Sequence, residues 1–214
     1  MKARLLGVAI ALLAARTANA ETPKWFSAEI GAGGMQMTGT AVKDVYGSKN
    51  EPAFHMRGGV LIKSILDIGC GGDFAQITGH RVGTVGGASS AETSRLTLGP
   101  MFGTALVRLD VLRNQWVVPY AGGGVAYLVW SERNPASNKQ VDGDKYGWTA
   151  VGGLQILLDT FEPARAADVD SYSGINDTFL TLEISRTDYD RLGRGPTGLD
   201  LSHWTGRAAF LFEF

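Results

Sequence analysis

The stretch that decides the fold is DLSHWTGRAAFLFEF, residues 200–214, at the carboxyl end of the chain. Counting back from the last residue, every second position is apolar or small, whereas the positions between them are mostly polar and include Arg207 and Glu213. A period of two indicates a β-strand with two unlike faces. Roughly ten residues separate Trp204 from Phe214, which is about what a tilted strand needs to cross a bilayer. The pattern predicts a strand with lipid on one side and polar contents on the other.

The terminal aromatic residues Phe210, Phe212 and Phe214 make this strand similar to the closing strand of bacterial outer-membrane β-barrel proteins. The resemblance implies that barrel-assembly machinery recognises this segment as an insertion signature during biogenesis. The alternative is a soluble β-protein that ends on an aromatic strand. The rest of the chain has to distinguish the two.

The amino end predicts export. Lys2 and Arg4 precede an apolar run at 5–15, and an A-x-A cleavage site follows at 18–20. This is the pattern of a secretory signal peptide, so we expect residues 1–20 to be removed after Ala20 and residues 21–214 to form the mature domain. No other stretch reaches about 18 consecutive apolar residues, so a membrane-spanning mature chain would have to be a closed barrel.

Composition excludes some classes of protein. The formal net charge is −1, which offers no electrostatic basis for binding nucleic acid. Cys70 is the single cysteine, so an intrachain disulfide is impossible. The glycine clusters at 31–34, 69–72 and 122–124 lie within predicted strands and do not complete a G-x-G-x-x-G motif, so we expect them to relieve crowding in the sheet.

Eight alternating segments predict an all-β fold, an eight-stranded antiparallel transmembrane β-barrel. The fifth segment makes the chain similar to small OmpA-like and OmpW-like barrels. The eight segments span residues 25–37, 53–62, 66–78, 94–107, 116–130, 146–158, 178–186 and 200–214.

The connections between these segments differ in length. Polar stretches at 38–52, 79–93, 131–145 and 187–199 are expected outside the cell, where barrel loops are long. The connection at 159–177 is too long for an ordinary periplasmic turn. Pro163 and the alanine-rich residues after it predict one short periplasmic helix between strands six and seven.

Alternation predicts that a set of charged residues faces the lumen. Opposite charges there should pair, because an unpaired buried charge is strongly unfavourable. Two interpretations stay open: a salt-bridged plug that closes the lumen, or a narrow polar pathway gated by these pairs. The predicted luminal charge network consists of Glu29, Arg57, Asp67, Asp73, Arg95, Glu183, Arg207 and Glu213.

Aromatic residues near the strand ends are expected to anchor the barrel at the two membrane interfaces. We expect outer-membrane lipid and lipopolysaccharide as partners of this surface, and a monomeric protein. In strand five the alternation places Val118, Tyr120, Leu128 and Trp130 on one outward face. In strand four it places Leu96 and Leu98 outward. The predicted anchors are Tyr120, Trp130, Trp148 and Trp204.

Neither the histidines nor the three residues that resemble a hydrolase triad predict a metal site or an active site. His55 and His203 should face the lumen and His80 should begin an outer loop, and their spacing predicts no metal site and no cofactor. Ser185, Glu183 and His203 resemble a hydrolase triad, but alternation turns all of them inward, away from lipid substrate.

The sequence favours a non-enzymatic barrel in the cell outer membrane of a Gram-negative bacterium. Its function would be envelope structure, adhesion or small-solute passage. One alternative is a barrel enzyme that modifies lipid A. Another is a soluble exported carrier of the lipocalin kind, which should have the opposite arrangement of polar and apolar faces.

Overall fold

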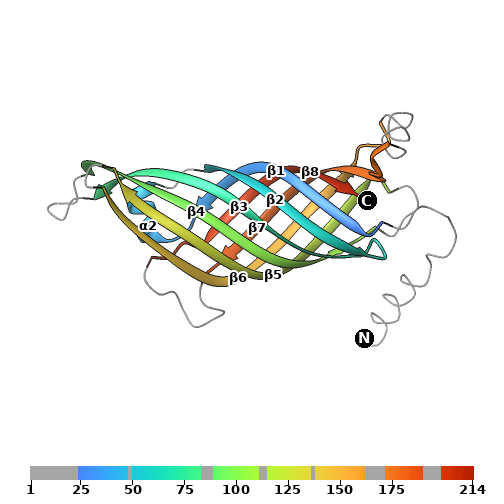
Figure 1. Ribbon diagram of the computed structural model, residues 1–214, viewed down its shortest axis with the longest axis horizontal. Helices are drawn as coiled ribbons and strands as arrows, with labels where there is room; N and C mark the ends of the chain where they lie inside the picture. Colours follow the sequence, from blue (N-terminus) through green and yellow to red (C-terminus); the bar gives the residue numbers. More distant parts are fainter. Residues whose placement is uncertain are drawn as a thin grey trace.

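The chain, seen in a computed structural model, is described over residues 24–47, 50–82, 89–110, 115–135, 138–161, 172–189 and 199–214. Eight antiparallel strands form one closed barrel in which β1 pairs with β8 (Figure 1). This confirms the predicted fold. The predicted signal peptide, residues 1–20, lies outside the described residues. The strands are β1 (Phe26–Met37), β2 (Glu51–Ile62), β3 (Leu66–Val82), β4 (Ser89–Arg108), β5 (Val117–Asn134), β6 (Lys139–Leu157), β7 (Asp177–Asp188) and β8 (His203–Glu213).

The closing pair β1–β8 joins the two ends of the sheet. Ser27 lies opposite Glu213 and Met37 lies opposite His203, so the pairing runs the whole length of β1. The backbone amide of Trp25 donates to the carbonyl of Phe214 at 2.7 Å. We call the end of the barrel that holds these two residues the terminal end, and the opposite end the loop end. Because the sheet closes on itself, β1 and β8 pair with each other instead of leaving two free edges.

Alternation on β8 follows the prediction closely. Trp204 and Phe210 are exposed on the outer wall, whereas His203, Arg207 and Glu213 are buried inside. Tight curvature also imposes glycine at some inward positions. A Cβ on Gly124 would lie 1.8 Å from the carbonyl oxygen of Gly103 on the neighbouring strand, so no side chain fits there.

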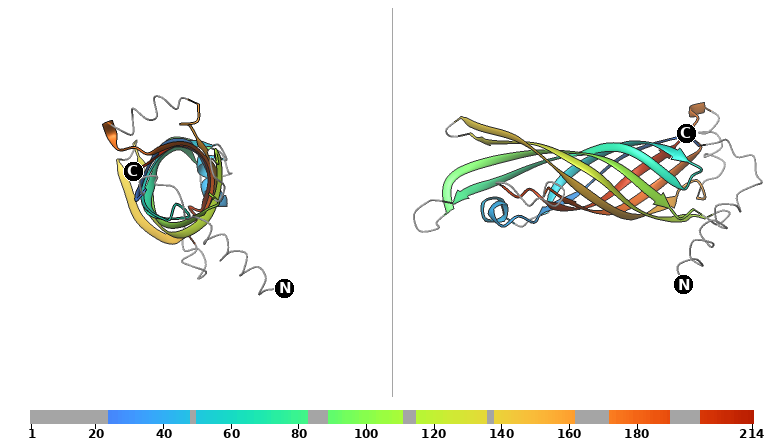
Figure 2. Two further views of the ribbon diagram at one scale, coloured as in Figure 1. Left: turned by 90° about the vertical axis from the view of Figure 1, so that its right-hand side faces the viewer. Right: turned by 90° about the horizontal axis from the view of Figure 1, so that it is seen from below.

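Strands β3 to β6 are longer than predicted. They contain 17, 20, 18 and 19 residues, whereas β1, β2 and β7 contain 12 each. The hairpins β3–β4 and β5–β6 therefore reach beyond the other strands at the loop end (Figure 2). Most described residues of the predicted loops 79–93 and 131–145 are strand. The backbone pairing continues there, although the alternation of apolar and polar residues fades. The alternation fades because a projecting hairpin has no lipid on its outer face.

The connections hold two departures from expectation. A short helix, α2 (Thr40–Tyr46), lies in the first loop-end connection, where none was predicted. The helix predicted to start at Pro163 falls on residues outside the described ranges, although Tyr172 and Ser173 of the same connection are helical. The β2–β3 turn is as short as predicted, and Lys63 and Ser64 adopt φ values of 53° and 54°. No helix in the described part of the chain is long and apolar enough to cross a bilayer.

Candidate functional site

The candidate site is the lumen, and its middle section is organised around Arg207 on β8. The Arg207 guanidinium donates from Nε to Glu183 Oε1 at 2.6 Å, and its Nη2 also pairs with that carboxylate. Nη1 donates to both oxygens of Asp73 at 3.0 and 3.1 Å. The guanidinium also lies over the ring of Phe102, 5.6 Å from its centroid. One cation thus joins β3, β7 and β8 across the lumen.

His55 extends this network toward β1. Its Nδ1 lies 2.7 Å from Asp73 Oδ1, its Nε2 lies 3.5 Å from Glu29 Oε1, and its ring stacks on Phe102 at 5.7 Å. The hydroxyl of Tyr120 donates to Glu183 Oε2 at 2.7 Å. Asp73 and Glu183 therefore each have a cation and a hydrogen-bond donor, which is what burial of charge requires, whereas Glu29 Oε1 makes no hydrogen bond among the described residues.

A second ion pair lies closer to the terminal end. Arg57 donates to both oxygens of Asp67 at 2.9 and 2.6 Å, and its Nε donates to the hydroxyl of Thr104 at 3.3 Å. Ser27 donates to the same carboxylate at 3.2 Å. The two parallel hydrogen bonds fix the relative orientation of the guanidinium and the carboxylate, so this ion pair links β2 and β3 in one geometry.

Near the terminal end of the lumen lies Arg108, a buried residue that was absent from the predicted network. Arg108 Nη1 lies 2.5 Å from Glu213 Oε1, and the guanidinium lies over the ring of Phe179 at 5.4 Å. Lys24 pairs with Asp177 and lies 3.8 Å from Glu213. Correct alternation on β4 was the signal that could have identified Arg108 from the sequence.

Outside the strands, one carboxylate at the terminal end has an altered acidity. Burial, and after it the negative charge of Asp177, raise the pKa of Asp159 above its ordinary value. A hydrogen bond from the backbone amide of Thr178, at 3.3 Å, partly opposes this shift.

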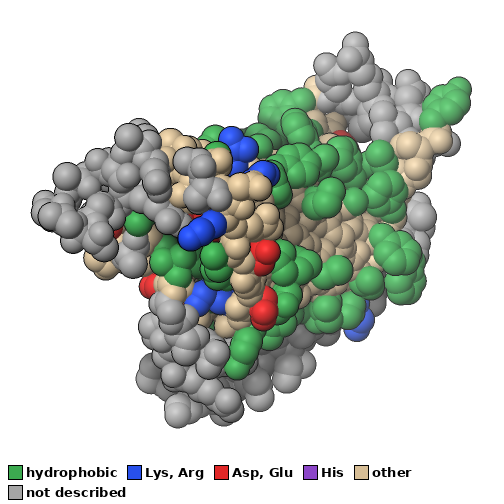
Figure 3. Space-filling view, turned by 60° about the vertical axis from the view of Figure 1, so that its left-hand side comes forward, with side chains coloured by type: hydrophobic (Ala, Val, Ile, Leu, Met, Phe, Trp, Pro, Cys, Tyr) green, Lys and Arg blue, Asp and Glu red, His purple; other side chains and the backbone are tan. Residues whose placement is uncertain are grey.

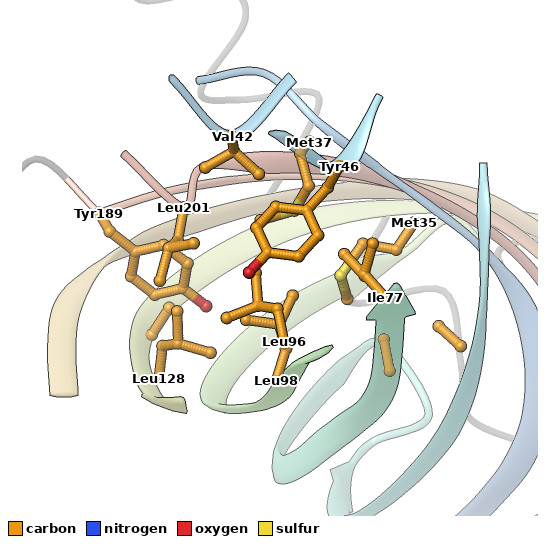
Figure 4. Close-up of a cluster of buried hydrophobic side chains, with 13 residues drawn as sticks. Met35, Met37, Val42, Tyr46, Ile77, Leu96, Leu98, Leu128, Tyr189 and Leu201 are labelled. Carbon is orange, nitrogen blue, oxygen red and sulfur yellow. The ribbon is translucent and has the colours of Figure 1, made fainter. Parts of the chain in front are cut away.

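The loop end of the lumen is apolar. Val42 and Tyr46 of α2 point into the barrel toward Leu96, Leu98 and other aliphatic side chains (Figure 4). The helix packs tightly, because a Cβ on Gly79 of β3 would lie 2.3 Å from the carbonyl oxygen of Val45. We call this group the apolar layer. It consists of Met35, Met37, Val42, Tyr46, Ala53, Ala75, Ile77, Leu96, Leu98, Ala126, Leu128, Tyr189 and Leu201.

The predicted faces of β4 and β5 are wrong, and two predicted site residues therefore lie elsewhere. Arg95 is exposed on the outer wall and does not join the luminal network, and Tyr120 is buried inside instead of lying at a membrane interface. Four residues that were predicted to face outward point inward instead: Leu96, Leu98, Val118 and Leu128. At the loop end the usual arrangement is reversed on β4, because Leu96 and Leu98 pack in the apolar layer while Arg95 and Thr97 lie on the outer wall, so hydrophobicity indicates the wrong face there. Tyr120 lies in a separate buried cluster with Leu106 and Val151. A shift of one residue exchanges the two faces of a strand.

The other predicted residues divide as follows. Trp148 and Trp204 are exposed on the outer wall, whereas Trp130 is partly buried and packs against the apolar layer. Phe210 and Phe214 face outward and Phe212 is half-buried. The buried charged residues of the lumen are Glu29, Arg57, Asp67, Asp73, Arg108, Glu183, Arg207 and Glu213.

The residues that resembled a hydrolase triad are not joined. Glu183 is engaged by Arg207 and Tyr120, and the Nδ1 of His203 lies 3.1 Å from the carbonyl oxygen of Leu201. Ser185 is 4% exposed and His203 is 1% exposed, so both are enclosed in the lumen. His80 has no described side chain.

No family model and no curated protein matches the chain. Solved structures do match. The outer membrane protein OprG from Pseudomonas aeruginosa matches with a TM-score of 0.58 and 12% identity, over 89% of this chain and 97% of that one. Neisserial surface protein A (NspA) matches with a TM-score of 0.56 and 11% identity, over 88% and 97% of the two chains. The chain therefore has the fold of small eight-stranded outer-membrane barrels.

Proposed function

We propose that the protein is a non-enzymatic outer-membrane barrel with a closed lumen, which presents the long strands β3 to β6 outside a Gram-negative cell. The observation that carries this proposal is the closure of the lumen at successive levels. Envelope structure or adhesion is then favoured over passage of a solute. The fold shared with OprG and NspA supports the membrane location.

The outer wall supports insertion into a bilayer. Exposed apolar side chains cover it, with Trp25, Trp116 and Phe214 at the terminal end and Trp148 and Trp204 toward the loop end. Ten residues separate Trp204 from Phe214, or roughly 33 Å along the strand and about 23 Å along the barrel axis at a tilt near 45°. That height is close to the apolar band of outer-membrane barrels, about 25 Å. Figure 3 shows the hydrophobic surface, with charged side chains gathered on its loop-end side.

Three layers close the lumen. Arg108 and Glu213 close the terminal end, the ion pairs around Arg207 and Arg57 fill the middle, and the apolar layer with α2 fills the loop end. Eight-stranded barrels have an interior just wide enough to be filled by side chains. A hydrated ion would have to pass both buried ion pairs and an apolar section, each of which is an electrostatic or dehydration barrier.

The two competing functions conflict with particular observations. A soluble carrier needs an apolar interior throughout and a polar exterior, whereas Ile30, Phe54 and Ile184 are exposed on the outer wall and charged residues fill the middle of the lumen. A lipid-modifying enzyme needs catalytic groups that reach lipid, whereas Ser185 and His203 are enclosed. The aromatic end of β8 supports recognition by barrel-assembly machinery, which also remains our proposal.

Planar-bilayer recording tests this function. The folded protein should show no stable single-channel steps, because its three layers act in series. The control is heat-modifiable mobility on a denaturing gel, measured on the same reconstituted sample, which shows that the inserted barrel is folded. Reproducible conductance steps from a folded sample would contradict the closed lumen and favour the alternative of solute passage.

A further inference from the structure

The outer wall of β2 to β5 contains an apolar furrow with a volume of about 1080 Å³. Glycines at outward positions form its floor, and larger side chains such as Phe54, Phe74 and Met101 form its sides. Cβ atoms added at Gly58 and Gly103 would meet nothing closer than 3.9 and 3.8 Å, so the floor is open rather than tightly packed. The furrow lies within the apolar band, where its contents would be lipid.

A second hollow, of about 640 Å³, continues the furrow toward the loop end. It shares Phe74, Tyr127 and Val129 with the furrow and adds the polar residues Thr97 and Ser131 and two exposed acids of β6, Asp142 and Asp144. The lining thus changes from apolar to polar along one line of the wall. A lipid lying along this line would place its acyl chain in the apolar furrow and its polar end in the second hollow.

Two arginines lie next beyond this polar section. Arg95 of β4 and Arg133 of β5 are directly opposite in the register, and both are exposed on the outer wall. Like charges placed directly across a strand pair are destabilising. Arg133 donates to the side chain of Asn138 at 3.0 Å, and the ion pairs among the described residues include neither arginine. An anion between the two guanidinium groups would remove this repulsion.

The level of the pair suits a phosphate of a lipid headgroup. Arg133 lies four residues beyond the apolar residue Val129, or about 13 Å along the strand and roughly 9 Å along the barrel axis. That height lies in the headgroup layer that flanks the hydrocarbon core. Guanidinium groups match phosphate oxygens with paired hydrogen bonds. The acids Asp142 and Asp144 lie in the hollow beside the pair, and Asp142 accepts hydrogen bonds from Gln140 at 2.9 and 3.1 Å. Arg95 and Arg133 are the two cations paired directly across β4 and β5 at this level.

We infer that this face binds a phosphorylated lipid of the outer leaflet, with an acyl chain in the furrow and a phosphate between Arg95 and Arg133. The inference rests on the proposed membrane location and on the assignment of the loop end to the cell exterior. It needs neither a closed nor an open lumen, so the conductance result does not decide it.

Binding of purified lipid A to the detergent-solubilised protein tests the inference, with dephosphorylated lipid A and inorganic phosphate as separate probes. The double variant Arg95→Gln/Arg133→Gln should bind lipid A at least about ten-fold more weakly, a change of about 1.4 kcal/mol. Dephosphorylated lipid A should bind the native protein with the same loss. The matched control, Lys43→Gln/Lys139→Gln, removes two other exposed loop-end charges and should bind lipid A like the native protein.

The furrow has its own variant. Gly58→Leu fills the floor and should weaken binding of lipid A several-fold, whereas Gly206→Leu on β8, where an added Cβ meets nothing within 4 Å, should have no effect. Heat-modifiable mobility confirms that each variant is folded. Equal binding by both charge variants would overturn the arginine site. Inorganic phosphate binding as tightly as lipid A, together with native-like binding by Gly58→Leu, would overturn the assignment to a lipid.

Discussion

Replacing Arg207 with methionine is the sharpest perturbation of the luminal network. The side chain is buried and it is the shared partner of Glu183 and Asp73. Methionine keeps much of the volume and removes the charge, so packing changes little. Two carboxylates are then left enclosed: Asp73 keeps only His55, and Glu183 keeps only the hydroxyl of Tyr120.

The magnitude follows from this loss of partners. Removing one member of a buried ion pair typically costs about 3–5 kcal/mol, because the remaining charge stays buried without compensation. Arg207→Met should therefore lower the free energy of unfolding by about that amount. The double variant Arg207→Met/Glu183→Gln should be more stable than the single variant, since one of the two stranded charges is gone.

Urea unfolding in phosphatidylcholine vesicles measures these differences, followed by tryptophan fluorescence and by heat-modifiable mobility. Arg95→Met is the matched control, because the same substitution on the exposed outer wall should change stability by only about 0.5 kcal/mol. Similar losses for Arg207→Met and Arg95→Met would refute the reasoning. So would a double variant less stable than Arg207→Met alone.

Two further predictions concern the ends of the barrel. Asp159 has a raised pKa in the folded state, so its ionised form opposes folding at pH values above its ordinary pKa. Asp159→Asn should therefore be at least as stable as the native protein in urea at pH 7, and this advantage should vanish at about pH 3, where both states are protonated; a clear loss of stability at pH 7 would contradict the assignment. In a Cys70→Ser background, Asn138→Cys at the β5–β6 turn should react with a membrane-impermeant maleimide on intact cells, whereas Lys63→Cys at the β2–β3 turn should react only after permeabilisation. The reverse pattern would invert the proposed orientation.

Much of the fold was readable from alternation alone. On β1, β2, β3, β6, β7 and β8 the predicted inward and outward positions agree with the structure, for example Glu29, Arg57 and Glu183 inside and Phe210 outside. At most levels of the barrel, charged or polar residues occur on just one of the two faces of these strands. A polar face beside an apolar face leaves a single arrangement that avoids placing charge in lipid.

The candidate site was only partly readable. Arg207, Glu183 and Asp73 come from β8, β7 and β3, and only barrel closure brings them together. The helix α2 carries few strong helix signals, with no side-chain N-terminal cap, and it is held by packing against β3 and the apolar layer. Such a helix depends on tertiary contacts more than on local propensity.

The sequence by itself determined the class of fold, the number of strands and the faces of β1, β2, β3, β6, β7 and β8. Only the tertiary structure decided the faces of β4 and β5, the place of Arg95 and Tyr120, and the partners of each luminal charge. The reason is physical: alternation reports that the two sides of a strand differ, but not which side faces inward. On β4 and β5 apolar side chains fill the lumen, whereas Arg95 and Arg133 lie on the outer wall at the loop end, so the rule that polar residues face inward fails there.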